Sequence, residues 1–428
     1  MSPTPRLAAF LVAAALSFLF LPPAVPALVI LALMAAAAAD ALTVRGPPSL
    51  ERSVPGILAR GVPSPIAVEV DAGGAAVRVR QPVPPDLDLD PREADGRLAA
   101  TLVARRRGRN PLPAPAVRVE GRLGLGRVHH ESGPDSEVLV YPDMPAAYRL
   151  VVAVRQGRFR DPGVLTRGPL GLGTDFESIR DYLPDDDIRQ VNWRATARTG
   201  RPMSNQYRVE QDRSVICCID TGRLMAAPVR APAPQGRPET SPSVPLTRLD
   251  AALDAAVAVA LVADEVGDQA GAIAFDGAVR RRLTPRRRGG QAVVGALFDL
   301  EPTSADSDYE LAFRSIGGGK RSLVIVFTDL LEEAAARSLV EAIPVLARRH
   351  HVVVAGVRDP DLDRAVRTPP VEVRDVLAAS VVVEVLDARA RVAAQLRRAG
   401  AEVLEAPPDA LAAACVGAYL RAKARSRL

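Results

Sequence analysis

The stretch SVICCID, residues Ser214–Asp220, decides the fold of the C-terminal half of the chain. It is a short, continuous apolar run that ends in an aspartate, and this predicts a strand that is buried on both faces. The stretches RSLVIVFTDL (Arg321–Leu330) and HVVVAGVRD (His351–Asp359) have the same character. Strands of this kind occur in parallel sheets that helices cover on both sides.

Helical patterns separate these predicted strands. Thr247 starts a helix, with Asp250 three residues further on. Apolar residues then recur every four residues and predict one buried stripe, formed by Leu249, Leu253, Val257 and Leu261. The alternation of strand and helix patterns predicts an α/β domain with a mostly parallel sheet over residues 213–428.

Aspartates follow the predicted strands at the edge of the sheet where ligands of such folds bind. Asp220 and Asp329 are placed to converge on a hard cation such as Mg²⁺, which prefers oxygen ligands. The alternative is that these aspartates cap the next helix or are solvated. Asp359 fits that alternative best, because it lies in the polar loop RDPDLD.

Two uncharged apolar runs, Leu7–Leu21 and Ala27–Ala39, stand near the N-terminus and are separated by a proline-containing connection. Each run is shorter than the roughly 20 residues that a straight membrane span needs. A cleaved signal peptide and a single kinked span are alternatives, but the prolines favour two short helical spans that form a hairpin over residues 1–42. Arg6 and Arg45 favour a cytoplasmic location for the rest of the chain, in a cell membrane.

The segment 43–165 contains short stretches in which apolar and polar residues alternate, separated by breaks rich in proline and glycine. Alternation with a period of two predicts half-buried strands, and several of them predict an all-β, sandwich-like domain. The predicted strands are Ile66–Val70, Ala75–Arg80, Leu98–Arg106, Ala116–Leu123, Glu137–Pro142 and Tyr148–Gln156.

The segment 166–212 holds the block GTDFESIRDYLPDDDIRQVNWRATARTG, Gly173–Gly200, in which acids and arginines surround the single tryptophan of the chain. Asp187 is placed to cap a short helix, with Gln190 at the position that completes a capping box. Gly200 is a natural stop for this helix. Trp193 lies between its apolar and basic faces, where we expect it to anchor the helix to the adjoining domain.

Two interpretations of this block are compatible with each other. In the first it is an ion-paired clasp between the β-rich part and the α/β domain, because arginine forks bind carboxylates bidentately. In the second the same surface docks a partner, because arginine and tryptophan dominate binding energy at interfaces. The residues predicted for the junction or for partner binding are Arg180, Asp187, Arg189, Trp193, Arg194 and Arg198.

Catalytic residues are not predicted. The block has carboxylates for acid–base chemistry, but the neighbouring arginines would hold them ionised. It has no histidine and no G-x-S-x-G nucleophile context, and the chain has no P-loop. An enzyme, such as a hydrolase of unknown substrate, is therefore the least favoured class of function.

Composition narrows the partners further. The chain has 55 basic and 50 acidic residues, and its arginine-rich runs are local, so nucleic-acid binding is not expected. Its three cysteines have neither the count nor the spacing of a disulfide framework or a zinc site, which fits a reducing compartment.

The α/β segment, with ICCIDTG and LVIVFTDL, resembles a von Willebrand factor A (vWA) domain. The block Gly173–Gly200, followed by a strand and IDTGRLM, looks like the hallmark of the DUF58 family, and the N-terminal hairpin and the β-rich segment match that family's usual layout. The resemblance implies a vWA-like, Rossmann-type C-terminal domain. It also implies an association with MoxR-type AAA+ ATPases, and so a membrane-anchored partner or scaffold in the assembly or maturation of client proteins.

The resemblance also bears on metal binding. A metal-binding vWA domain uses a D-x-S-x-S loop, a threonine from a second loop and an aspartate from a third. Here Gly222 and Leu224 stand where the two serines would be, and Arg223 lies between them. The remaining ligands would be Asp220, Thr303 or its neighbour Ser304, and Asp329. This degenerate set implies weak Mg²⁺ binding at most, and a metal-dependent ligand-binding vWA protein is the alternative function.

Overall fold

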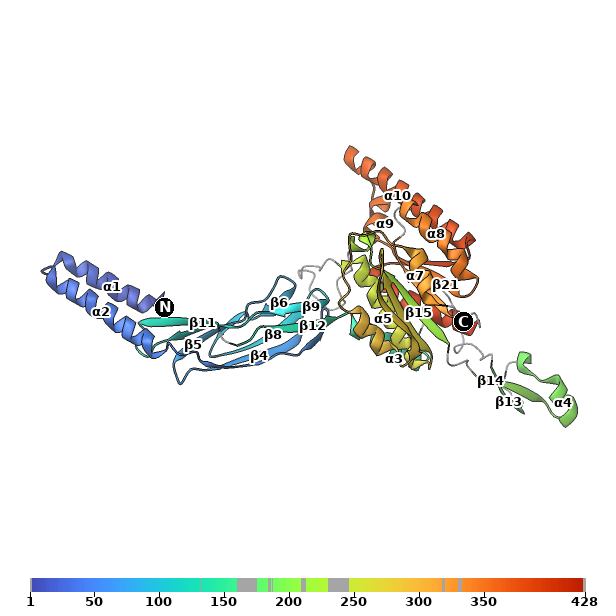
Figure 1. Cartoon of the computed structure of the whole chain (residues 1–428), viewed down its shortest axis with the longest axis horizontal. Coiled ribbons are helices and arrows are strands. Elements are labelled where there is room, and N and C mark those ends of the chain that lie inside the picture. The colour runs from blue at the N-terminus through green and yellow to red at the C-terminus, as the bar shows by residue number, and fades with distance from the viewer. Residues whose placement is uncertain are drawn as a thin grey trace. The chain divides into compact units, whose positions relative to one another are not determined.

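The computed structural model describes residues 2–131, 133–159, 175–183, 186, 188–208, 213–229, 246–317, 320–329 and 333–425. The chain separates into two compact units, Met1–Tyr141 and Pro142–Leu428 (Figure 1). The first unit contains the N-terminal helices and the β-rich part. The second contains the block with the single tryptophan and the α/β domain.

The N-terminal apolar runs form two helices that lie side by side in Figure 1. Helix α1 spans Pro5–Leu16 and continues into the 3₁₀ turn Ser17–Leu19, and helix α2 spans Ala24–Thr43. By length and composition, α2 is the one described helix that could cross a membrane, and α1 is shorter. The prediction of an apolar helix that could span a membrane is confirmed for α2.

The base of this helix pair is attached to the turn between strands β10 (Ala116–Glu120) and β11 (Gly126–Glu131). Asp40 of α2 is buried and accepts hydrogen bonds from the backbone N–H groups of residues 123 and 125, both at 2.9 Å, and of 126, at 3.1 Å. Thr4, which caps α1, donates its hydroxyl to the carbonyl of residue 124 at 2.6 Å. Both open ends of the pair therefore lie at one turn.

Strands β1 to β12 form three sheets in the first unit. Their orders are β1-β11-β10-β5-β7, β2-β4-β8-β6 and β3-β12-β9. Alternating residues such as Val68, Val79 and Leu102 are completely buried between the strands. The remaining strands are β1 (Ser2–Pro3), β2 (Ser49–Ser53), β3 (Ile57–Ala59), β4 (Ser64–Asp71), β5 (Ala76–Arg80), β6 (Leu87–Asp90), β7 (Glu93–Asp95), β8 (Arg97–Ala104), β9 (Gly108–Leu112) and β12 (Ser136–Tyr141).

The prediction of a strand over Tyr148–Gln156 is wrong, because helix α3 spans Met144–Arg155. Asp143 caps α3 by accepting a hydrogen bond from the N–H of Ala146 at 2.9 Å. The stretch LVVAVR is therefore helical although its residues alternate. The helical spacing places Ala147, Val151 and Val154 on one buried face. This helix belongs to the second unit.

The three predicted buried strands are neighbours in a six-stranded sheet with the order β19-β18-β15-β20-β21-β22, in which they are β15, β20 and β21. Five strands are parallel, and β19 is antiparallel to β18, so the mostly parallel sheet is confirmed. The strands are β15 (Ser214–Asp220), β18 (Gln269–Phe275), β19 (Val279–Arg287), β20 (Leu323–Phe327), β21 (His351–Val357) and β22 (Glu402–Ala406).

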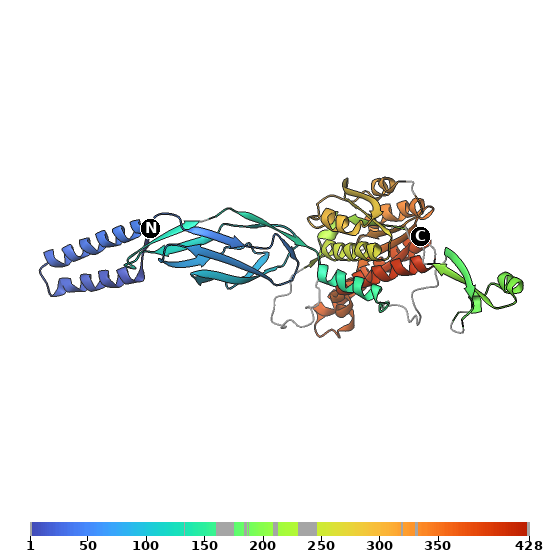
Figure 2. The same cartoon turned by 90° about the horizontal axis from the view of Figure 1, so that it is seen from below.

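Helices cover both faces of this sheet. One face carries α5 (Arg248–Glu265), with α3, α6 (Gly290–Leu297) and α11 (Pro408–Ala424) packed around it, and Figure 2 shows α3, α5 and α11 side by side. The other face carries α7 (Tyr309–Ile316), α8 (Glu333–Ala347) and α10 (Val373–Arg398). Smaller elements are η3 (Arg223–Ala226), β16 (Pro228–Val229), β17 (Leu246–Thr247) and α9 (Pro360–Arg367).

Helix α5 is the central helix of the domain. Its predicted start is confirmed, since Thr247 and Asp250 form a capping box. The predicted single stripe is too narrow, because nearly every residue from 248 to 263 is buried. The reason is that α3 and α11 cover the side of α5 that faces away from the sheet, and the many alanines of α5 let them approach.

Candidate functional site

The carboxyl ends of β15 and β20 form the topological switch point of the sheet. From β15 the chain first crosses to β18 on one side and later returns to β20 on the other. Ligands of open α/β sheets bind in the crevice at such a point. Asp220 ends β15, and Thr328 and Asp329 follow β20, so the sequence prediction that Asp220 and Asp329 share this edge of the sheet agrees with the topology.

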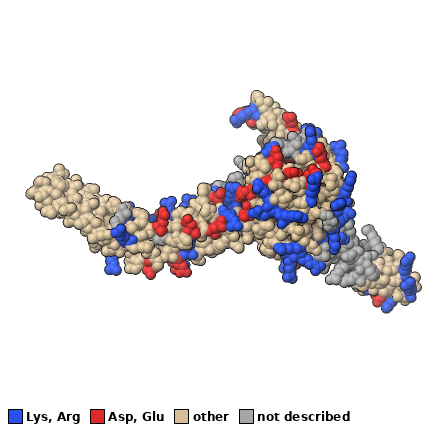
Figure 3. Space-filling view, viewed as in Figure 1, with Lys and Arg blue, Asp and Glu red and all other residues tan. Residues whose placement is uncertain are grey.

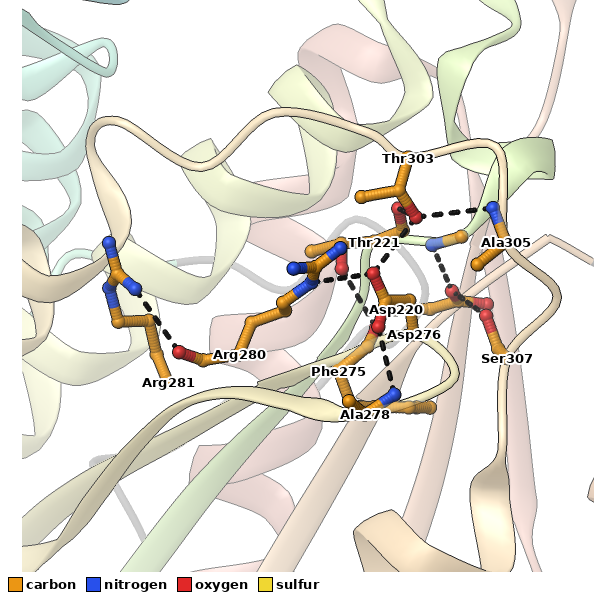
Figure 4. Close-up of polar contacts among 11 residues, drawn as sticks. Asp220, Thr221, Phe275, Asp276, Ala278, Arg280, Arg281, Thr303, Ala305 and Ser307 are labelled. Carbon is orange, nitrogen blue, oxygen red and sulfur yellow. Dashed lines mark hydrogen bonds and ion pairs between the residues drawn. The ribbon is translucent and has the colours of Figure 1, made fainter.

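Asp220 is buried and surrounded by hydrogen-bond donors. Its carboxylate accepts from the hydroxyl of Ser307 at 2.5 Å (Figure 4). It also accepts from the hydroxyls of Thr328 at 2.7 Å and Tyr309 at 2.9 Å, and from the N–H of Gly222 at 2.8 Å. Burial, together with the charge of Asp220, raises the pKa of Tyr309 well above its usual value, so this phenol stays protonated and donates. No local pattern in the sequence singles out these three hydroxyls, because only the fold brings them to Asp220.

Gly222 stands where a vWA serine would be, and the structure gives a reason for the glycine. A Cβ at this position would collide with the Ser307 hydroxyl and lie 2.9 Å from the carbonyl oxygen of Ala305. The loop that carries Ser307 therefore approaches the backbone too closely for a serine. Ser307 brings a hydroxyl to Asp220 from a different loop.

Thr303 lies beside a different carboxylate, that of Asp276, which follows β18. Its hydroxyl donates to Asp276 at 2.9 Å, and Arg280 and the N–H of Ala278 also donate, at 2.6 and 2.9 Å (Figure 4). Burial alone would raise the pKa of Asp276, but these hydrogen bonds outweigh it and hold the pKa below its usual value. Asp276 thus acts as an ionised anchor for the loop that follows α6.

Asp329 forms a buried ion pair with Arg248, the first residue of α5. Both side chains are almost completely inaccessible to solvent. A cation at a helix N-terminus is opposed by the helix dipole, so the pairing with Asp329 explains why an arginine stands there. A guanidinium already supplies the positive charge that a metal ion would bring to Asp329.

These contacts engage Asp220, Thr303 and Asp329 in three polar clusters, of which the first two adjoin, because the N–H of Thr303 donates to the carbonyl of Thr221 at 2.7 Å. Asp220 accepts hydrogen bonds from hydroxyls and a backbone N–H, and Thr303 donates to Asp276. Asp329 forms its ion pair with Arg248. Within the part of the chain that the structure describes, no three His, Cys, Asp or Glu side chains are grouped in a way that could hold a metal. The donor set does not fit a Mg²⁺ centre, and we derive no chemistry through one.

We expect Mg²⁺ and EDTA to leave the melting temperature of the protein unchanged, to within about 1 °C. A ligand present at one hundred times its dissociation constant would stabilise the folded state by about 2.7 kcal/mol. Differential scanning fluorimetry with Mg²⁺, with Ca²⁺ as a matched cation, and with EDTA measures this. A shift of several degrees with Mg²⁺ alone would show that the three clusters rearrange around the ion.

The tryptophan-containing block forms a β-hairpin with a helix in its connection. Strand β13 (Asp175–Asp181) pairs with β14 (Met203–Arg208), and a 3₁₀ turn, Ile188–Gln190, and helix α4, Trp193–Thr199, lie between them. We refer to residues 175–208 as the signature hairpin. Its two strands pair with each other. The sequence patterns predicted a short helix in this block but not these strands.

Helix α4 begins later than the sequence analysis predicted. Asn192 is the N-cap and accepts from the N–H of Ala195 at 3.0 Å. The reason is that Val191 pairs with Ser204 and the N–H of Asn192 donates to the carbonyl of Met203, so the backbone is still extended there. The proposed cap Asp187 lies outside the described residues. The predicted stop at Gly200 is confirmed by its left-handed backbone, with φ of 71°.

Arg180 is paired inside the signature hairpin. It donates two hydrogen bonds to Asp186, at 2.6 and 2.8 Å, and these bonds hold the pKa of Asp186 below its usual value. Arg194 and Arg198 are exposed on α4, and the side chain of Arg189 lies outside the described residues. Trp193 exposes 69% of its surface in this structure, and the expectation that it anchors α4 to the adjoining domain stays a prediction.

Residues 178–402, more than half of the chain, match the family model described as "Protein of unknown function DUF58". The chain belongs to the DUF58 family. The DUF58 match begins in β13 and ends at the first residue of β22, so it covers the signature hairpin and most of the α/β domain together.

Other comparisons add little to the DUF58 assignment. No curated protein matches the sequence. Among solved structures, one match is a Bacteroides ovatus GH5 xyloglucanase in complex with a XXXG heptasaccharide, with 10% identity and a TM-score of 0.15. It covers 83% of this chain, and this chain spans 65% of that one. Such a likeness carries no argument about fold or function.

Proposed function

We propose that this DUF58 protein is a membrane-anchored adaptor or scaffold that works with a MoxR-type AAA+ ATPase in the assembly or maturation of client proteins. The observation that carries the proposal is the exposure of the apolar and basic side chains on the signature hairpin. The proposed role of the hairpin is to dock the ATPase.

The docking surface is defined by four described residues of the signature hairpin: Ile188, Trp193, Arg194 and Arg198. Ile188 and Trp193 expose 70% and 69% of their surface. Tryptophan and arginine are enriched among the residues that dominate binding energy at interfaces. Arg194 and Arg198 are four residues apart on α4, so they share one face of the helix.

The proposed membrane anchor is the pair α1 and α2, with two spans and with the bulk of the chain in the cytoplasm. In Figure 3 the visible surface over most of α1 and α2 is free of charged side chains. The start of α1 and the end of α2 both lie at the β10–β11 turn. If the pair spans the bilayer, the chain therefore enters and leaves the bilayer on the same side. Recovery of the full chain in the soluble fraction after an alkaline wash of membranes would contradict this anchor.

The α/β domain is proposed to be vWA-like. Support comes from the parallel sheet with helices on both faces and from Asp220 at the end of its first strand. A metal-dependent binding mode is not proposed, because Asp220, Thr303 and Asp329 are each engaged by groups of the protein itself. Reaction chemistry at a thiol is not proposed either, since burial raises the pKa of Cys217 to about 12 and also raises those of Cys218 and Cys415.

We predict that Trp193→Ala weakens binding of the ATPase by at least about tenfold, because truncation of a hot-spot residue costs 2 kcal/mol or more. The measurement is co-purification of the ATPase with the tagged full chain from detergent-solubilised membranes. Folding should be unaffected, because the side chain is mostly exposed.

Val345→Ala is the matched control, since Val345 of α8 is also 69% exposed but lies outside the signature hairpin. This variant should bind the ATPase as the parent chain does. Unchanged co-purification with Trp193→Ala would rule out docking through this surface, and equal loss in both variants would point to a nonspecific effect.

A further inference from the structure

Helix α10 has two halves with different surroundings. Its C-terminal half packs on the sheet through Val392 and Leu396, which are fully buried. Its N-terminal half extends beyond the rest of the α/β domain (Figure 1). Large apolar side chains are exposed along this half, with exposed fractions from 43% to 77%, namely Val373, Val376, Leu377, Val381 and Val383. A solvated helix face normally carries polar residues, so the exposed apolar side chains of this half indicate an interaction surface.

One stripe of this half has the spacing of a coiled-coil seam. Arg374, Leu377, Val381 and Glu384 follow one another at intervals of three, four and three residues, and all four are exposed. This is the a/d pattern of a heptad repeat. The seam has apolar residues in the middle and opposite charges at its two ends.

The seam is complementary to itself when two copies run antiparallel. With the twofold axis level with Ala379, Leu377 of one copy meets Val381 of the other, and Arg374 meets Glu384. A twofold interface requires one patch to be complementary to itself in this way. A parallel arrangement would instead place Arg374 against Arg374 and Glu384 against Glu384, which like-charge repulsion disfavours.

We propose that the occupant of this surface is a second copy of the chain, and that α10 pairs antiparallel with α10 of that copy. The inference is independent of the proposed docking of an ATPase. Because the seam is short, it buries less than the about 800 Å² per partner of a standard stable interface. The dimer is therefore weak, with a dissociation constant on the order of 10 μM.

Charge exchange tests the pairing. Arg374→Glu and Glu384→Arg should each weaken self-association of the full chain by about tenfold or more, because each places like charges together at both ends of the seam. The double variant should return to within about twofold of the parent chain. Residues 374 and 384 lie about 15 Å apart along one helix, so this rescue requires two copies.

The measurement is sedimentation velocity of the full chain in detergent over a range of concentrations. Arg367→Glu on α9 is the matched control, since it reverses an exposed arginine outside the seam and should leave association unchanged. Circular dichroism melts establish that each variant is folded. A parent chain that stays monomeric at 100 times the expected dissociation constant would overturn the proposal. A double variant no better than the single variants would also overturn it, and would indicate contact through another surface.

Crosslinking gives a second, independent readout. The native cysteines are all buried, so an introduced surface cysteine is the accessible one. A mixture of Arg374→Cys and Glu384→Cys chains should crosslink with a short bis-maleimide, whereas either variant alone should not. Equal crosslinking in the unmixed samples would exclude the antiparallel register.

Discussion

Replacement of Arg248 by methionine is expected to destabilise the α/β domain by about 3–5 kcal/mol. The substitution keeps much of the side-chain volume but leaves the carboxylate of Asp329 buried without its counter-ion. For a domain of this size the loss corresponds to a decrease in melting temperature of about 10 °C or more. Thermal unfolding followed by circular dichroism measures it.

Two further variants separate the ion pair from general effects of the substitution. The double variant Arg248→Met, Asp329→Leu should recover most of the lost stability, because a packed apolar pair replaces a buried ion pair at little cost. Arg314→Met, which breaks an exposed pair with Glu310 on α7, should cost less than about 1 kcal/mol. If Arg248→Met behaved like Arg314→Met, the ion pair between Arg248 and Asp329 would be solvated and not buried.

Replacement of Lys423 by methionine should also destabilise the α/β domain, at the amino ends of the strands. Lys423 of α11 donates to Asp268 at 2.7 Å, and both residues are buried. Asp268 also accepts from Tyr419 at 2.5 Å, and burial, together with that charge, raises the pKa of Tyr419 well above its usual value. The cluster ties α11 to the start of β18, so we expect a loss of about 3–5 kcal/mol in chemical denaturation.

The control is Arg421→Met on the same helix, where a partly exposed arginine contacts Glu402 at 3.3 Å. It should cost no more than about 1 kcal/mol. Asp268→Asn combined with Lys423→Met should recover part of the stability, because it removes the unpaired charge and keeps an acceptor for Tyr419. Equal small losses for Lys423→Met and Arg421→Met would contradict a buried charge cluster.

Local sequence patterns predicted those strands and helices whose own residues are enough to show whether they are buried. The run Ser214–Asp220 is apolar throughout, so it predicts burial on both faces without further information. The stretch LVVAVR in α3 has no such clarity, because its apolar residues fit either a strand or a helix, and the cap at Asp143 decided for the helix. In the signature hairpin, pairing of Val191 with Ser204 moved the start of α4, a contact between residues that no short window contains.

The sequence by itself determined the family, the apolar N-terminal helix and the alternation of buried strands and helices in the α/β domain, because periodicity and caps act over a few residues. Only the tertiary structure decided which polar groups meet at the end of the sheet. Ser307, Tyr309 and Thr328 reach Asp220 from positions 87, 89 and 108 residues away in the chain, and Arg248 reaches Asp329 from the start of α5. These partners are set by the crossover connections of the sheet, since a buried carboxylate takes whichever donors the fold places around it.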